Sequence, residues 1–523
     1  MTQIHGGDTI APWLCARAPL LARVLAWIAR TTLAMDRSIN AALATTVAWT
    51  GAICAVIALQ ILLIITHKPW LDEWQAVLIA VQTPTWPDLL AALRYEGHPP
   101  LWYAILRGLA HFLSAPLLIL PVAAALIAVP GQLAILLAAP FARSQRLCLA
   151  LSEFVLFEFF TVSRSLTLGA ACVFLALALW RRGHWAWPFI VLLPQCDFLF
   201  GVLSFIFVGW RWAERRAPLG WLGGWIASGL LAAWWVRPAP DVAPAITQHG
   251  PFARLVDWLA GMSAQGLPLQ WHGLRPEWDQ PPPALLGALA LFALTAMAWT
   301  QLRGRWADRV VLAAFVGFTL VFSVGVYALS IRHLMLCTLL LVAMVWRQAL
   351  AGGPGPGVWM RAWLWLVAGC GLFMAVAALI MPFNNSDRAS AWIASHNLSQ
   401  ERWLAFPESA GEGISGLSGM PFQRLGKRCT QSFTRWNNPE PQKLVDGAQF
   451  YRALASTAKH EGSFYLLSDF SLPDMPPLIR RIGDVPAGLD GQAFHFYRVG
   501  EGLPPRGQAT PPCTAPLRPF VRF

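Results

Sequence analysis

Long apolar runs alternate with short basic clusters over the first three quarters of the chain. The clearest run, residues 41–66, contains no charged residue. It exceeds the roughly 20 residues that a helix needs to cross a bilayer. Further runs follow near 147–162, 165–180, 185–210, 218–236, 284–302, 308–327, 334–347 and 362–381. With an odd number of crossings inside 98–142, the pattern predicts an α-helical polytopic membrane protein with about eleven transmembrane helices.

The basic clusters predict how these helices are oriented. The clusters are Arg143/Arg146, Arg181/Arg182, Arg211/Arg215/Arg216, Arg303/Arg305/Arg309 and Arg347/Arg361. Basic residues are enriched in the cytoplasmic loops of membrane proteins. We therefore expect a cytoplasmic N-terminus and a plasma-membrane (inner-membrane) location. Residues 67–97, 237–283 and 384–523 are then expected outside, in the periplasm of a cell with two membranes.

The first 40 residues predict a different kind of helix. Their apolar stretch is interrupted by Arg17, Arg23, Arg30 and Arg37, whose spacing places them near one helix face. Such a helix lies in the membrane interface rather than across it. We expect residues 1–40 to form a cytoplasmic, interfacial amphipathic segment that precedes a transmembrane domain over residues 41–383.

One apolar run is too short for the two crossings that its flanking basic clusters require. Residues 185–210 are interrupted by Pro194, Gln195 and Asp197. Backbone breaks at membrane depth are tolerated only where they are buried in protein or line a water-filled cavity. The sequence therefore predicts two half-helices that meet at a polar break, with Asp197 facing a cavity.

The last part of the chain differs in charge density. Residues 1–383 carry 39 charged residues, whereas the 140 residues from 384 to 523 carry 27. Short buried strands are expected at Arg402–Pro407, Ser463–Leu467 and Phe494–Val499, with a helix over Val445–Lys459 and an extended end after 501. This predicts a small extracytoplasmic α/β domain. Its two cysteines, Cys429 and Cys513, can form a disulfide on the oxidising side of the membrane.

Composition narrows the classes further. Only 13% of the residues are charged, against about 25% in soluble domains, which excludes an ordinary cytosolic enzyme. The net charge of +12 is explained by arginines at helix ends, so no nucleic-acid partner is expected.

Acidic and histidine side chains bracket the first predicted external loop. Asp72 and Glu73 open a helical stretch, and Glu96 and His98 precede Pro99-Pro100. An amphipathic helix lying on the membrane, with its acids in the first turn, would account for Asp72 and Glu73 alone. Two acidic motifs at the ends of one loop also suit a general base or a cation site.

These motifs resemble those of the GT-C glycosyltransferases. Asp72-Glu73 after the first span, followed by His98-Pro99-Pro100-Leu101-Trp102-Tyr103, resembles the branch that includes protein mannosyltransferases and the aminoarabinose and galacturonic-acid transferases. Glu158–Arg164 resembles an external turn of that family, and Ser330–His333 its late Arg-His motif. The family's tyrosine after Arg164 is absent, and its polar break reads Gln195-Cys196-Asp197 here.

The resemblance implies a GT-C-like catalytic domain over residues 41–383. It would transfer a sugar, with inversion, from a polyprenyl-phosphate donor to a glycan, glycolipid or protein acceptor at the outer membrane surface. Asp72, which matches the family's catalytic acid and would be the general base, and the adjacent Glu73 would be the catalytic residues. Glu96, His98 and Asp197 would contact the acceptor. Alternatively, Asp72, Glu96 and His98 would hold a divalent cation such as Mg²⁺, Mn²⁺ or Zn²⁺.

Cations near the predicted span ends would bind the donor phosphate, on which negative charge grows as the bond breaks. They are Lys68, Arg164, Arg332 and His333. Each could equally be a charged side chain that reaches from the membrane to the lipid interface.

Two other classes fit parts of the pattern. A transporter or flippase of lipid-linked glycans would also contain broken helices and buried charges, but it should show inverted repeats, which we do not find. A non-catalytic assembly protein with a GT-C fold would explain the missing tyrosine.

Overall fold

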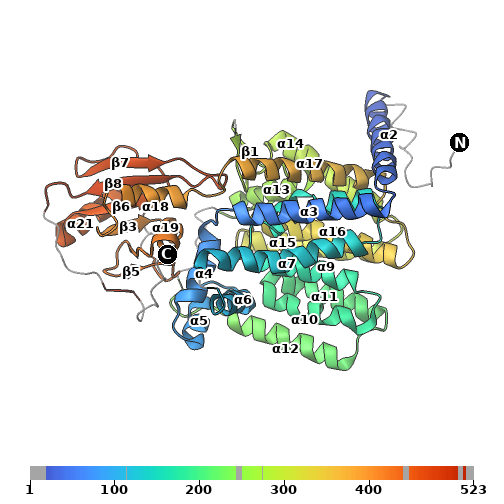
Figure 1. Ribbon diagram of the computed structural model, residues 1–523, viewed down its shortest axis with the longest axis horizontal. Coiled ribbons are helices and arrows are strands. Elements are labelled where there is room, and N and C mark those ends of the chain that lie inside the picture. The colour runs from blue at the N-terminus through green and yellow to red at the C-terminus, as the bar shows by residue number, and fades with distance from the viewer. Residues whose placement is uncertain are drawn as a thin grey trace.

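The apolar runs form a bundle of helices that lie side by side (Figure 1). The computed structural model describes residues 19–113, 115–242, 250–273, 275–439, 444, 447–503 and 511–513. Six described helices are long and apolar enough to cross a membrane: α3 (Thr46–Thr66), α7 (Pro116–Ala138), α14 (Ala284–Gln301), α15 (Trp306–Gly325), α16 (Ile331–Leu350) and α17 (Val358–Ile380). Such a set is characteristic of a multi-pass membrane protein.

The remaining helices of the bundle are shorter than the sequence pattern predicts. Besides α4 (Leu71–Gln82), α5 (Trp86–Leu93), α6 (Leu101–Ala110) and α13 (Pro251–Gly266), they are α8 (Arg143–Ala150), the π-helical turn η1 (Glu153–Phe159), α9 (Ser165–Ala178), η2 (Gly183–Ala186), α10 (Trp187–Cys196), α11 (Phe198–Ala213) and α12 (Leu219–Trp235). The run at 147–162 is not one span, since its backbone leaves the helix at Ser152 and resumes as η1. By length and composition the described residues therefore hold six spans, fewer than expected, and the count of about eleven stays a prediction.

The polar break in the run at 185–210 is present. Helix α10 ends at Cys196, Asp197 is extended with φ −161° and ψ 158°, and α11 begins at Phe198. The Asp197 side chain accepts a hydrogen bond from the Leu199 backbone N–H at 2.9 Å, which caps α11. The two half-helices lie beside one another (Figure 1), as the proline and the carboxylate in this run predict.

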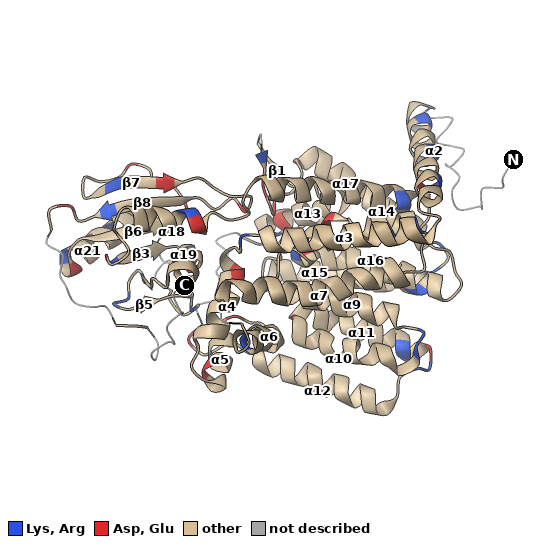
Figure 2. Cartoon of the chain, viewed as in Figure 1, with Lys and Arg blue, Asp and Glu red and all other residues tan. Residues whose placement is uncertain are grey.

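Helix α2 (Pro19–Ala42) lies across one end of the bundle rather than along it (Figure 1). Its Asp36 forms an ion pair with Arg361 at 3.6 Å and accepts a hydrogen bond from Trp365 at 3.1 Å. This placement fits the interfacial segment expected over 1–40, of which residues 1–18 lie outside the described part. Arginines gather at this same end of the bundle (Figure 2).

The C-terminal part forms a mixed six-stranded sheet at the other end of the bundle (Figure 1). The strand order is β5-β4-β3-β6-β8-β7, with β3 parallel to both β4 and β6 and the other pairs antiparallel. The strands are β3 (Trp403–Phe406), β4 (Phe422–Gln423), β5 (Thr430–Gln431), β6 (Phe464–Ser468), β7 (Ile479–Val485) and β8 (Phe494–Val499). Its helices are α18 (Ser386–Ser395), η3 (Glu408–Gly411), α19 (Glu412–Ser418) and α21 (Gly447–Glu461).

This sheet confirms the three expected strands and the expected helix of an α/β domain. Strands β4, β5 and β7 were not predicted. Two of them have only two residues, and β7 carries exposed arginines on a surface strand, so none shows an apolar pattern. Most of the expected extended end after residue 501 lies outside the described residues.

The predicted disulfide is present between Cys429 and Cys513, which are 84 positions apart. It joins the start of β5 to a segment that also pairs with Thr430. Replacing both cysteines by serine should lower the free energy of unfolding of the C-terminal domain by about 4 kcal/mol in the chain-entropy account. Thermal unfolding of the wild type with and without reductant checks this. An unchanged midpoint after complete reduction would contradict it.

The arrangement of charges gives a testable topology. We expect a cysteine placed at exposed Ala394 on α18 to react with an impermeant maleimide in intact cells. A cysteine at exposed Arg182, at the far end of the bundle, should react only after the membrane is opened. The background would keep Cys429 and Cys513 and lack the other cysteines. Labelling of intact cells at Arg182 but not at Ala394 would show that the orientation is the opposite of the predicted one.

Candidate functional site

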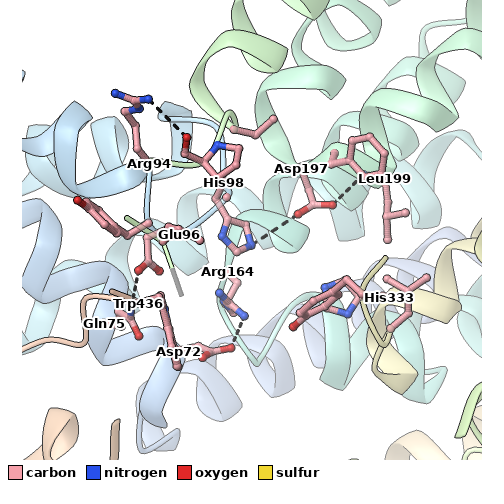
Figure 3. A pocket seen from close by; sticks show the side chains of 18 of the residues that line it. Asp72, Gln75, Arg94, Glu96, His98, Arg164, Asp197, Leu199, His333 and Trp436 are labelled. Carbon is pink, nitrogen blue, oxygen red and sulfur yellow. Dashed lines mark hydrogen bonds and ion pairs between the residues drawn. The ribbon is translucent and has the colours of Figure 1, made fainter. Parts of the chain in front are cut away.

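A cavity of about 500 Å³ lies where the helical bundle meets the C-terminal domain (Figure 3). Six residues selected from sequence line it, although they lie far apart along the chain. Those six are Asp72, Glu96, His98, Arg164, Asp197 and His333. The cavity therefore brings together both ends of the segment 67–97, the break between α10 and α11, and the start of α16.

Asp72 lies in the first turn of α4 (Leu71–Gln82), next to the cavity. Its carboxylate forms an ion pair with Arg164, the residue that precedes α9. Figure 3 shows the two side chains pointing toward one another at the centre of the site. The pair holds the carboxylate in a fixed position while its side chain keeps about a quarter of its surface exposed (24%).

Glu73 points away from the cavity and is fully buried. It accepts hydrogen bonds from the Ser163 N–H at 2.6 Å and the Trp70 N–H at 3.1 Å, and it lies 2.7 Å from His67 Nε2. These contacts tie the start of α4 to the turn that carries Arg164. This geometry favours a positioning role for Glu73 rather than direct contact with a substrate.

The sequence was compatible with an amphipathic helix on the membrane surface at Asp72 and Glu73, but the apolar stripe of α4, formed by Trp74, Val77 and Leu78, packs inside the protein. Trp74, Val77 and Leu78 are buried in a cluster with residues of α6 (Leu101–Ala110), α7 and the C-terminal domain. The stripe has a protein partner because the C-terminal domain packs against α4. Helix α4 is thus a packed wall of the site.

Glu96 faces the cavity between α5 (Trp86–Leu93) and α6. Its carboxyl group accepts a hydrogen bond from Gln75 Nε2 at 2.5 Å. The pKa of Glu96 is raised to about 8, chiefly by burial among protein atoms; Arg164 opposes this shift and Asp72 adds to it. Glu96 is therefore mostly protonated at neutral pH and can donate a hydrogen bond.

His98 and Asp197 meet across the cavity from Glu96 (Figure 3), with 3.7 Å between His98 Nε2 and the carboxylate. Burial lowers the pKa of His98, and Arg164 lowers it further, although Asp197 acts in the opposite direction. His98 is thus mainly a neutral imidazole at pH 7. His333 also lines the cavity, with Nδ1 at 2.8 Å from the Ser330 hydroxyl.

Arg332 and Lys68 lie outside the lining of this cavity. Arg332 is 2% exposed, and none of its three guanidinium nitrogens has a hydrogen-bond partner. Its charge lies over both the Trp70 and Trp278 rings, at 5.8 and 5.7 Å from their centroids. Lys68 is half exposed and forms an ion pair with Asp387 at 3.3 Å.

A buried acidic pair adjoins Arg332. Glu153 and Glu158 of η1 accept hydrogen bonds from the single amide group of Gln270, at 2.5 and 2.8 Å. Trp278 donates to Glu158 at 2.5 Å. Gln270 and Trp278 follow α13 (Pro251–Gly266), so part of the segment 237–283, which was expected to be an external loop, enters the bundle. π-Helical turns are often found at functional sites.

Sequence reasoning missed several residues that line the cavity, among them Gln75, Tyr327 and Trp436. Gln75 lies one helical turn after Asp72, a spacing that places both on one face and could have identified it. Trp436 carries no comparable signal, because it belongs to the C-terminal domain and reaches the cavity only through the tertiary fold.

The expected cation ligands do not form a cluster. Asp72 contacts Arg164, His98 contacts Asp197, and Glu96 contacts Gln75. Among the described residues, no group of three or more His, Cys, Asp or Glu side chains is placed to hold a metal ion. The donor set therefore offers no geometric support for a divalent cation at Asp72, Glu96 and His98, which stays a prediction.

The Glu96 carboxyl gives a pH prediction. Its pKa rises from an ordinary 4.5 to about 8 on folding. Between pH 4.5 and about pH 8, Glu96 is therefore protonated in the folded state and ionised in the unfolded state. The thermal unfolding midpoint should fall as pH rises from 5 to 8, and less steeply in Glu96→Gln. Part of the pH dependence should remain in Glu96→Gln, because burial also raises the pKa values of Glu412 and Asp490. Equal slopes for both proteins would contradict the prediction.

Comparison with known proteins finds no family model, no curated protein and no solved structure that matches this chain.

Proposed function

We propose that this chain is a membrane glycosyltransferase that moves a sugar from a polyprenyl-phosphate donor to an envelope acceptor. The observation that carries the proposal is the convergence of Asp72, Glu96, His98, Arg164, Asp197 and His333 on one cavity. Apart from Asp197, which was selected from the break between two half-helices, these residues lie in or beside motifs that resemble those of GT-C glycosyltransferases. Their meeting in space supports a shared site, while the sugar transfer itself rests on the resemblance and on the chemistry below.

The reaction requires a base and a cationic environment for the leaving group. Asp72 takes the proton from the acceptor hydroxyl as that oxygen bonds to the anomeric carbon. The bond from that carbon to the phosphate oxygen breaks, and the phosphate leaves with the electron pair, so the configuration inverts. Arg164 is placed to stabilise the growing charge, and positioned groups of this kind are the usual source of such stabilisation.

An apolar groove beside the cavity suits the prenyl chain of the donor. Its volume is about 470 Å³, and it is lined by residues that include Trp86, Leu101, Leu231 and Trp235. The groove and the cavity adjoin at three places along the chain. Pro100, Gln195 and Trp235 line the groove, and His98, Asp197 and Val236, one or two positions away from them, line the cavity. A lipid in the groove would place its phosphate at the cavity.

Mass spectrometry of envelope glycans and glycolipids, with and without the protein, tests the function. We expect one sugar to be missing from one acceptor when the protein is absent, and its lipid-linked donor to accumulate. An unchanged glycan and glycolipid profile would contradict the proposal. Lipid-linked glycans held on one side of the membrane would instead indicate a flippase.

A further inference from the structure

One segment of the C-terminal domain crosses from its sheet to the walls of the cavity. We call residues 432–438 the bridging segment. It begins just after β5 and the Cys429–Cys513 disulfide. Phe433 packs in the buried cluster of α4, α6 and α7, and the Ser432 hydroxyl donates a hydrogen bond to Gln82. The bridging segment is therefore anchored on the helical bundle.

Polar contacts hold the rest of the bridging segment on both sides. Gln75 donates to the Thr434 carbonyl at 3.3 Å, and the Thr434 N–H donates to Glu412 at 2.8 Å. Arg435 donates to the Tyr95 hydroxyl at 3.0 Å. Beyond Trp436, the Asn437 side chain donates to Asp241 at 3.0 Å. Trp436 thus has fixed neighbours before and after it in the chain.

Trp436 keeps 38% of its surface exposed although its neighbours are anchored. Among the described lining residues, it is the only one from the C-terminal domain. Its ring lies beside Gln75 and Glu96, on the opposite side of Asp72 from Asp197 and His333 (Figure 3). An exposed indole face next to hydrogen-bonding carboxyl and amide groups is suited to a pyranose, which has an apolar C–H face and hydroxyl edges.

We propose that Trp436 binds the acceptor sugar, so that the C-terminal domain selects the acceptor of the transferase. The inference rests on the proposed function. In an inverting displacement, the acceptor and the leaving phosphate lie on opposite sides of the anomeric carbon. The apolar groove and His333 place the donor on the bundle side of Asp72, which leaves the side of Trp436 for the acceptor.

The test compares variants in cells that lack their own copy of the protein. Trp436→Ala should reduce the amount of modified acceptor at least tenfold, while Trp436→Phe, which keeps an aromatic face, should retain most of it. In vesicles with donor and acceptor isolated from these cells, Trp436→Ala should raise the KM for acceptor and leave the KM for donor unchanged. Trp185→Ala is the matched control, since Trp185 is 60% exposed and far from the cavity.

The outcomes separate this inference from the function on which it rests. If cells with and without the protein give the same envelope, the transferase proposal fails. If Asp72→Asn is inactive but Trp436→Ala equals wild type, only the role of Trp436 is overturned. If Trp436→Ala does not accumulate in the membrane, the inference is tested by photo-crosslinking, with the photoreactive residue benzoylphenylalanine placed at position 436. A saccharide adduct there, but not at 185, supports the inference, and its absence at 436 overturns it.

Discussion

Asp72→Asn should abolish sugar transfer while leaving the protein folded and able to bind its lipid donor. Asparagine keeps the size of the side chain and can still accept a hydrogen bond from Arg164, so the contact between α4 and the start of α9 remains. It cannot take the proton of the acceptor hydroxyl. Positioned general bases contribute about 10²–10⁴-fold, so kcat should fall at least a hundredfold.

A second acid in the same loop provides the control. Asp88 also lies in the first turn of a helix, where it caps α5 through Thr85, and it does not line the cavity. Asp88→Asn should leave turnover within twofold of wild type. Activity of Asp72→Asn within tenfold of wild type would show that another group is the base. Glu96 would then be tested next, because it shares the cavity.

Arg332→Met should weaken binding of the lipid phosphate without destabilising the protein. The guanidinium is buried and has no hydrogen-bond partner in the structure, so a linear apolar side chain removes a buried charge without breaking a hydrogen bond. A phosphate that hydrogen-bonds to Arg332 would lose about 1.5–3 kcal/mol per bond. The Kd for undecaprenyl phosphate should therefore rise at least tenfold.

Arg211 offers the opposite case for comparison. It is also fully buried, but it donates to the Trp180 carbonyl at 2.9 Å and to that of Gly183. Arg211→Met should lower the unfolding midpoint and leave the Kd for undecaprenyl phosphate unchanged. Equal loss of stability in both variants, with unchanged binding in both, would mean that Arg332 has a structural role only.

The sequence predicted the features that depend on local pattern. Uninterrupted apolar runs are sufficient for α3 and α17, and a proline followed by a carboxylate is sufficient for the break at Asp197. It could not separate Asp72 from Glu73, because consecutive helical residues differ by about 100° in direction and only the tertiary packing decides which one meets the cavity. Ser163, which binds Glu73, is distant in sequence.

Other features depend on contacts between distant segments. The burial of α4 follows from its cover by the C-terminal domain, so its apolar stripe alone was equally compatible with a lipid surface. The path of the segment after α13 into the bundle depends on Gln270 meeting Glu153 and Glu158, and no spacing along the chain indicates that meeting.

The bridging segment also determines when, during synthesis of the chain, the site becomes complete. Trp436 is made after the last span, and the segment that presents it is tied through Cys429 to Cys513, which is made later still. A chain whose spans are all inserted would still have an open site until the C-terminal domain folds and its thiols are oxidised. Under the proposed function, the side of the cavity that Trp436 lines would thus be complete only in the mature protein.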